Sequence, residues 1–143
     1  MRMRVIKKLG GFPCCHRQWR DEGHCSYLHG YDRWVEIEMD GPRDDRGWVV
    51  DFADLKRVRL ALEHQFDHTV LIAPDDPHLD TFRELEIANV LDLRVMDPTM
   101  EGMALWVRDM VSEWLSSSYP HVRLVRVTCW ENEKNAAQWL RDV

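Results

Sequence analysis

The sequence predicts a single α+β domain in which two helices pack on one face of an antiparallel sheet. Two segments, residues 31–40 and 122–131, alternate apolar and polar side chains as half-buried strands do. Between them, residues 52–66 and the segment after Thr99 carry apolar residues at helical spacing. The length of 143 residues is close to the common size of one domain, so residues 1–143 are expected to form one unit.

The first two strands are expected in the amino-terminal third of the chain. Residues 2–9 have a strand-like composition, and residues 31–40 alternate regularly enough to assign their two faces. The predicted buried face carries Val35, Ile37 and Met39, and the opposite face carries Asp32, Glu36 and Glu38. A sheet with one polar face is typical of antiparallel strands that are covered on one side only.

A polar turn, a short strand and the first helix are expected next. Residues 41–52 combine turn-forming Gly, Pro and Asp residues with a short apolar run, which indicates a turn and a short strand. Asp51 is a suitable N-cap for a helix over residues 52–66. Its buried stripe is predicted to be Leu55, Val58, Leu62 and Phe66.

The second half of the chain is predicted to hold a loop, a helix and two strands. Residues 73–80 are rich in proline and aspartate, which favours a loop, and Thr99 can cap the helix that follows. The apolar face of that helix is predicted to be Met103, Val107, Met110 and Trp114. The late strand places Val125, Val127, Cys129 and Glu131 on one face, and residues 136–143 are expected to form a short last strand.

Charge and composition narrow the possible functions. The net charge of −6 and the isoelectric point near 5.6 disfavour binding to nucleic acid or to anionic membranes. No apolar run approaches the roughly 18 residues of a membrane span, and the basic amino terminus lacks the apolar core of a signal peptide. Four cysteines without a C-x-x-C pair are expected to be reduced thiols. We therefore expect a soluble cytoplasmic enzyme or protein-binding module.

Histidine and carboxylate residues suggest a metal site. His29 and Tyr31 are two positions apart on a predicted strand, so they point to one face, as two ligands of one metal would. His16, the pair Asp67–His68 and Glu131 are further candidates. Taken singly, each has a structural explanation: a capping or surface histidine, the polar end of a helix and a solvated strand end.

Taken together, six ordered segments resemble one family. They are FPCCHR (12–17), CSYLHGY (25–31), GWVVDFADLK (47–56), FDHTVL (66–71), DPTMEGMA (97–104) and WENEKNAAQW (130–139). Their order and spacing resemble the 6-pyruvoyl-tetrahydropterin synthase and 6-carboxy-tetrahydropterin synthase family, over nearly the whole chain. The resemblance implies a tunnelling fold (T-fold) that assembles into trimers or hexamers, closing a barrel with active sites between subunits.

The step from Cys25 to His29 is similar to that of the bacterial carboxy-type enzymes of queuosine (7-deazaguanine, preQ0) biosynthesis. These convert 7,8-dihydroneopterin triphosphate into 6-carboxy-5,6,7,8-tetrahydropterin, with loss of triphosphate and acetaldehyde. The resemblance implies Cys25 as the proton-abstracting thiolate, Asp67 and His68 as its relay, His16 and His29 as Zn²⁺ ligands, Glu131 as the pterin anchor, and Thr99 and Glu101 in the pterin pocket.

Tyr31 departs from the family pattern, which has the third zinc-binding histidine at this position. Presenting a phenolate near pH 7 costs roughly 4 kcal/mol, because phenol titrates near pH 10. His24, or a thiolate from Cys14 rather than Cys15, are possible substitutes. Two functions therefore stay open: an active synthase with weakened or altered metal binding, and a pterin-binding protein that has lost the metal-dependent lyase reaction.

Overall fold

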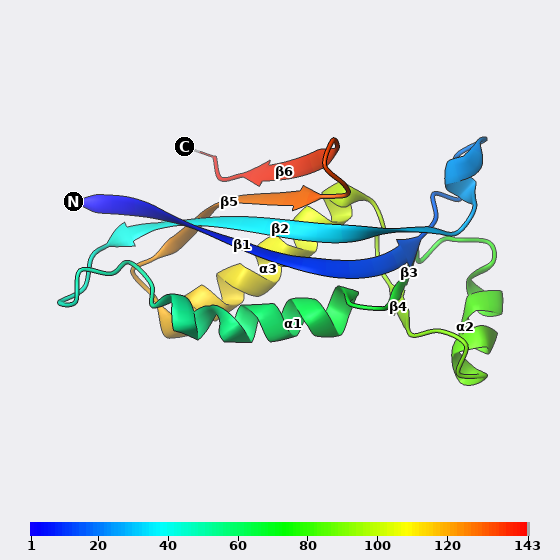
Figure 1. The fold of residues 1–143 in the computed structure, drawn as a ribbon, viewed down its shortest axis with the longest axis horizontal. Coiled ribbons are helices and arrows are strands. Elements are labelled where there is room, and N and C mark those ends of the chain that lie inside the picture. Colours follow the sequence, from blue (N-terminus) through cyan, green and yellow to red (C-terminus); the bar gives the residue numbers. More distant parts are fainter. Residues whose placement is uncertain (143) are drawn as a thin grey trace.

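A six-stranded mixed sheet forms the frame of the molecule (Figure 1). The computed structural model of the protein describes residues 1–142. The strand order is β4-β3-β1-β2-β5-β6. The strands are β1 (Arg2–His16), β2 (His29–Pro42), β3 (Val70–Ile72), β4 (Leu93–Val95), β5 (Arg123–Trp130) and β6 (Ala136–Leu140).

The long strands pair as predicted, and the two short ones do not. β1, β2, β5 and β6 are antiparallel neighbours, which confirms the predicted antiparallel core of the sheet. The short strands β3 and β4 extend this sheet in parallel register beside the end of β1. The prediction of a wholly antiparallel sheet was wrong at this edge, because strands of three residues are too short to show periodicity.

Two helices cover one face of the sheet (Figure 1). They are α1 (Lys56–Phe66), which follows the short 3₁₀ helix η2 (Phe52–Leu55), and α3 (Met100–Ser118). A third helix, α2 (Leu79–Ile87), was not predicted and lies at the end of the molecule near β4. Phe82 is the one buried residue of this helix, so the sequence of residues 79–87 carries little of the apolar stripe that would have predicted it. Among residues 1–142, every helix is too short or too polar to cross a bilayer.

The core lies between the sheet and these two helices. Val35, Ile37 and Met39 are fully buried, as predicted from their alternation. The α1 stripe is also confirmed, since Leu55, Val58, Leu62 and Phe66 are all buried. In α3, Met103 and Val107 are buried as predicted, but the next contacts are made by Val111 and Leu115. Met110 and Trp114 only flank the core, because α3 contacts the sheet along its i, i+4 row.

The segment between β2 and η2 differs from the predicted short strand, whereas the predicted cap at Asp51 is confirmed. Val49 and Val50 are buried but lie in a bend, so the expected short strand is absent from this described segment. Asp51 accepts a hydrogen bond from the Ala53 amide and so caps η2. The last strand ends at Leu140, and Val143 lies outside the described residues.

Candidate active site

Three strand ends bring His16, His29 and Glu131 together. His16 is the last residue of β1 and His29 the first of β2, and the two are direct partners in the antiparallel register. Their ring centroids are 4.4 Å apart. Glu131 follows the last residue of β5, the strand on the other side of β2, and its Oε1 lies 3.8 Å from His16 Nε2. One ligand atom from each of the three lies within 4.8 Å of the others.

Gly30 allows β1 and β2 to approach each other next to the paired histidines, where it is the register partner of Cys15. A Cβ atom at this position would lie 2.9 Å from the carbonyl oxygen of Cys14 and 3.4 Å from the Cys15 Sγ. The first contact is with backbone, which cannot rotate away. The glycine of the His-Gly-Tyr segment therefore sets the spacing on which the histidine pair depends.

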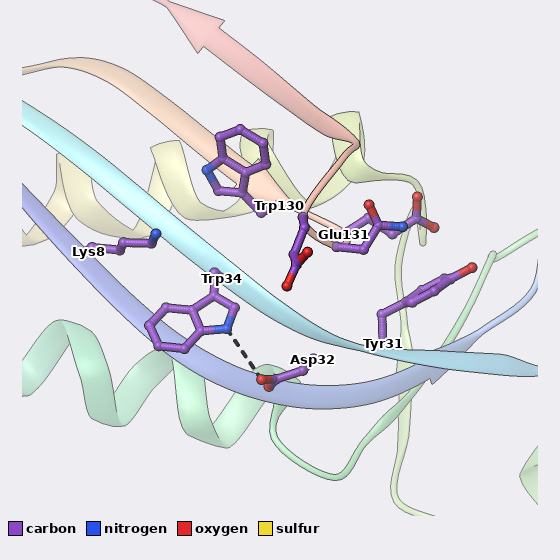
Figure 2. A pocket seen from close by; sticks show the side chains of 8 residues that line it. Lys8, Tyr31, Asp32, Trp34, Trp130 and Glu131 are labelled. Carbon is purple, nitrogen blue, oxygen red and sulfur yellow. Dashed lines mark hydrogen bonds between the residues drawn. The ribbon is translucent and has the colours of Figure 1, made fainter.

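A cavity of about 560 Å³ opens beside Glu131 (Figure 2). It is lined by Lys8, Tyr31, Asp32, Trp34, Trp130, Glu131, Asn132 and Glu133. Trp34 and Trp130 are cross-strand partners, and their indole N–H groups donate to Asp32 and Glu36 at 3.3 and 3.0 Å. The cavity thus combines flat aromatic surfaces with the Glu131 carboxylate, a combination that suits a flat heterocycle with N–H donors.

Arg33 is the site residue that the sequence analysis missed. It lies on the same face of β2 as Val35 and is fully buried. Its Nη2 donates hydrogen bonds to His16 Nδ1 at 2.9 Å and to the Pro98 carbonyl at 3.2 Å. Within residues 1–142, no carboxylate forms an ion pair with it and its Nε has no partner. The only signal in the sequence was an arginine at an apolar-face position of an alternating strand.

The surroundings of His16 hold it neutral. Burial, followed by the Arg33 charge and then by His29, lowers the pKa of His16 to about 3. His29 is held differently, because its Nδ1 lies 2.7 Å from the Tyr27 carbonyl oxygen. A carbonyl only accepts, so His29 Nδ1 carries a hydrogen and, in the neutral ring, Nε2 carries the lone pair.

These donors fit a Zn²⁺ ion only in part. Two imidazoles and a carboxylate are a usual ligand set, and His29 shows the usual arrangement, with its other nitrogen donating to a carbonyl. His16 does not, because a guanidinium has no acceptor and the lone pair of His16 must lie on Nδ1, facing Arg33. The hydrogen of neutral His16 is then on Nε2, the atom nearest Glu131. As arranged, these residues do not fit a resident zinc ion.

The substitutes proposed for the third ligand lie elsewhere. The ring centroid of Tyr31 lies 6.3 Å from that of His16 and 5.7 Å from that of His29, and the side chain is exposed at the cavity. Neither His24 nor Cys14 belongs to the cluster of ligand atoms found in residues 1–142. Burial raises the pKa of the Cys14 thiol, although Arg33 opposes this, so Cys14 is not a ready thiolate. Glu131 is the third member of the cluster instead.

His68 lines a second cavity, which shares Tyr31 and Asp32 with the first, and Asp67 pairs with His68. His68 Nδ1 is 2.8 Å from Asp67 Oδ1, and the His68 side chain is 81% exposed. His68 lines a cavity of about 490 Å³ together with Cys15, Tyr31 and Asp32. Tyr31 and Asp32 thus lie between the His68 side and the Glu131 side of the site.

The other predicted site residues are not part of this cluster. Cys25 is exposed in the 3₁₀ helix η1 (His24–Ser26), and its carbonyl accepts from the Gln18 amide at 2.8 Å. Thr99 caps α3 and lines a smaller cavity of about 190 Å³. Glu101 is exposed in the first turn of α3. Within one subunit, the structure therefore brings His16, His29 and Glu131 together. The Asp67–His68 pair lies on the other side of Tyr31.

A mixed sheet backed by two helices, with imidazole and carboxylate groups meeting at three strand ends, defines a class of small α+β enzymes. Residues 5–142 match the family model described as 6-pyruvoyl tetrahydropterin synthase, so the chain belongs to this family. Its curated relatives include proteins called 6-carboxy-5,6,7,8-tetrahydropterin synthase, with the words "probable" or "putative" in the archaeal cases.

Those relatives are similar at modest identity. The Halobacterium salinarum protein is 33% identical over 90 residues, which are 63% of this chain and 57% of that protein. The Pyrococcus abyssi protein is 27% identical over 127 residues, or 82% and 76% of the two chains. The Aquifex aeolicus protein is 22% identical over 155 aligned positions, covering 94% and 96%.

Solved structures show the same fold. An uncharacterized protein from Wolinella succinogenes superposes with a TM-score of 0.84 at 20% identity, over 99% of both chains. The 6-pyruvoyl tetrahydropterin synthase from Plasmodium vivax superposes with a TM-score of 0.69 at 17% identity, again over 99% of both. These matches confirm the predicted tunnelling fold.

Proposed function

We propose that this protein is a lyase of the 6-carboxy-5,6,7,8-tetrahydropterin synthase type, acting on 7,8-dihydroneopterin triphosphate in queuosine biosynthesis in the cytoplasm. The observation that carries the proposal is the meeting of His16, His29 and Glu131 at one end of the sheet, beside an aromatic cavity. Membership of the family and the names of the curated relatives support the reaction class.

Glu131 is the proposed anchor of the pterin ring. Its Oε1 faces His16, and its carboxylate also lines the cavity that holds Trp34 and Trp130. A carboxylate accepts two parallel charge-assisted hydrogen bonds from a guanidine-like edge, which orients the ring as well as binding it. The indoles offer apolar surface to the ring faces.

Cys25 is the proposed base and the Asp67–His68 pair its relay. The carboxylate of Asp67 accepts from His68 Nδ1, which leaves Nε2 of His68 free to exchange protons at the cavity. Cys25 is exposed and lies outside this cluster within one subunit. A homo-oligomer of three or six subunits, in which Cys25 completes the site of a neighbour, is therefore part of the proposal.

Zn²⁺ binding is proposed to be weak. His29 and Glu131 can each offer an electron pair, whereas His16 offers an N–H group toward the same point. Thr99 and Glu101 are proposed to line the pterin pocket only in the assembled oligomer.

Incubation with 7,8-dihydroneopterin triphosphate, followed by chromatography and mass spectrometry, tests this function. The wild-type protein should release acetaldehyde and triphosphate, and Cys25→Ala should lower turnover at least a hundredfold while pterin affinity stays within about twofold. Cys15→Ala removes the other exposed thiol, which lines the His68 cavity but is not the proposed base, so it should lower turnover far less than Cys25→Ala.

The alternative function is pterin binding without turnover. The Arg33–His16 contact and Tyr31 favour it, because both remove features of a metal site. Calorimetric binding of the pterin by wild-type protein, combined with no product after long incubation, would establish this alternative. Turnover that Cys25→Ala leaves unchanged would remove the proposed base.

A further inference from the structure

Among residues 1–142, Arg33 is a buried guanidinium with no carboxylate partner. Arg33 is fully buried between β2 and α3, where it contacts a histidine nitrogen, a backbone carbonyl and the Met103 sulfur at 3.6 Å, with the buried Cys14 thiol also beside it. Transferring a cation into such surroundings costs several kcal/mol, and a fold rarely keeps one there without a counter-ion. Arg126 differs in having a carboxylate beside it: its Nε lies 3.3 Å from Glu38, an ion pair without hydrogen-bond geometry.

The strongest contact of Arg33 sets the hydrogen position on His16. All nitrogen-bound hydrogens of a guanidinium are donors, so the 2.9 Å contact requires an electron pair on His16 Nδ1. A neutral imidazole has one electron pair and one hydrogen, so the hydrogen lies on Nε2. Nε2 is 3.8 Å from the Glu131 carboxylate, which is an electrostatically favourable place for an N–H group.

His29 presents the opposite arrangement at the same point. Its Nδ1–H donates to the Tyr27 carbonyl at 2.7 Å, which leaves an electron pair on Nε2. With ring centroids 4.4 Å apart and ligand atoms within 4.8 Å, one oxygen atom can contact both rings at ordinary hydrogen-bond lengths of about 2.7–3.2 Å. The Nε2–H donor of His16 and the Nε2 acceptor of His29 together match a hydroxyl group, which can accept one hydrogen bond and donate another.

We propose that Arg33 is a positioning residue that holds His16 as an Nε2–H donor, so that His16 and His29 form a metal-independent site for a hydroxyl group of the ligand. The guanidinium supplies a permanent positive charge behind His16, and both side chains are buried, where such a charge acts strongly. That the hydroxyl belongs to the polyol side chain of a dihydropterin rests on the proposed function; the donor–acceptor pair itself does not.

Long-range ¹H–¹⁵N correlation spectra of the metal-free protein test the arrangement directly. His16 and His29 are assigned from the His16→Gln and His29→Gln variants. We expect the Nε2–H form for His16 and the Nδ1–H form for His29. An Nδ1–H form at His16 would overturn the proposal, and this measurement needs no Arg33 variant to fold.

Zinc affinity, measured by competition with a chromogenic chelator, gives a second readout. Arg33→Met removes the donor and the charge with a side chain of similar length, so Nδ1 can take the hydrogen and Nε2 can bind metal. Arg33→Met should therefore bind Zn²⁺ at least tenfold more tightly than wild type, and Arg126→Met, the matched control, should not. Tight stoichiometric zinc in wild type that Arg33→Met leaves unchanged would refute the idea.

Turnover in excess chelator separates this inference from the proposed function. Product formation that survives metal removal and falls with Arg33→Met supports both. Product formation that requires stoichiometric zinc overturns the metal-independent site and leaves the lyase function standing. The expected histidine forms without any product overturn the lyase function and leave the hydroxyl site standing.

Discussion

At the residue scale, the four cysteines differ chiefly in burial. Cys14 and Cys129 are buried, and Cys15 and Cys25 are exposed. Burial raises the pKa of Cys129 to about 12 and also raises the pKa of Cys14. Since the thiolate is the reactive form, the two buried thiols are both less accessible and less ionised.

Thiol labelling checks this difference. A chromogenic disulfide reagent at pH 8 should modify Cys15 and Cys25 rapidly in the native protein, and all four cysteines in denaturant. Peptide mapping identifies the modified positions. Rapid native modification of Cys129 would mean that β5 is not packed as described.

His16 provides a pH-dependent contribution to stability. Its pKa is about 3 in the folded protein against the usual 6.5, so the unfolded chain takes up this proton first as the pH falls. The contribution is complete above about pH 6.5 and is lost toward pH 3, at up to about 1.4 kcal/mol per pH unit.

Urea unfolding in the presence of chelator, between pH 7 and pH 4, measures this effect. His16→Gln keeps an acceptor for Arg33 and cannot titrate, so its unfolding free energy should fall less steeply than that of wild type as the pH decreases. Parallel curves for the two proteins would show that His16 is not held neutral by the fold.

At the element scale, Thr99 starts α3 and so places the end of the long helix beneath the sheet. Its hydroxyl accepts from the Gly102 amide at 2.9 Å and donates to Asp97 at 2.7 Å. Gly102 is needed for the close approach, because a Cβ there would lie 2.5 Å from the Asp97 carbonyl oxygen. The DPT-x-x-G segment thus has a structural role within one subunit.

Replacing the cap should therefore weaken the helix. Thr99→Ala is expected to lower the free energy of unfolding by about 1 kcal/mol, and Thr99→Ser, which keeps the hydroxyl, by only a few tenths of that. Chemical unfolding monitored by tryptophan fluorescence measures both. Equal stability of Thr99→Ala and wild type would argue against the cap, and a separate loss of pterin affinity would support its place in the pocket.

At the scale of the whole molecule, the sheet has two open edges. β4 and β6 each pair on one side only, and β6 alternates between exposed and partly exposed residues. Free edges of this kind favour aggregation unless another strand covers them. Pairing between subunits would cover these edges, as in the barrel that the family resemblance implies.

Light scattering coupled to size-exclusion chromatography tests the assembly. We expect a mass of three or six times the 17.0 kDa chain at micromolar concentration. A monomer would contradict the barrel, and it would also separate Cys25 from the proposed site, because within residues 1–142 Cys25 does not line the cavity of His68.

The alternation of Val35, Ile37 and Met39 and the spacing of Leu55, Val58, Leu62 and Phe66 were sufficient to predict the buried faces of β2 and α1. Periodicity predicts a buried face because the side chains on one face of a strand or helix follow from their spacing in the sequence. The element that packs against this face does not change which residues form it. The family segments added the tunnelling fold and the pairing of His16 with His29.

Only the tertiary structure placed Glu131 beside His16 and Arg33 behind it. Those contacts depend on strand order and register, which join residues far apart in the chain, and no local pattern reports them. From the sequence alone, an arginine on the apolar face of a strand is compatible with a place at the edge of the sheet or in the core. Its burial without a carboxylate, and with it the hydrogen position on His16, followed from packing β1, β2 and α3 against one another.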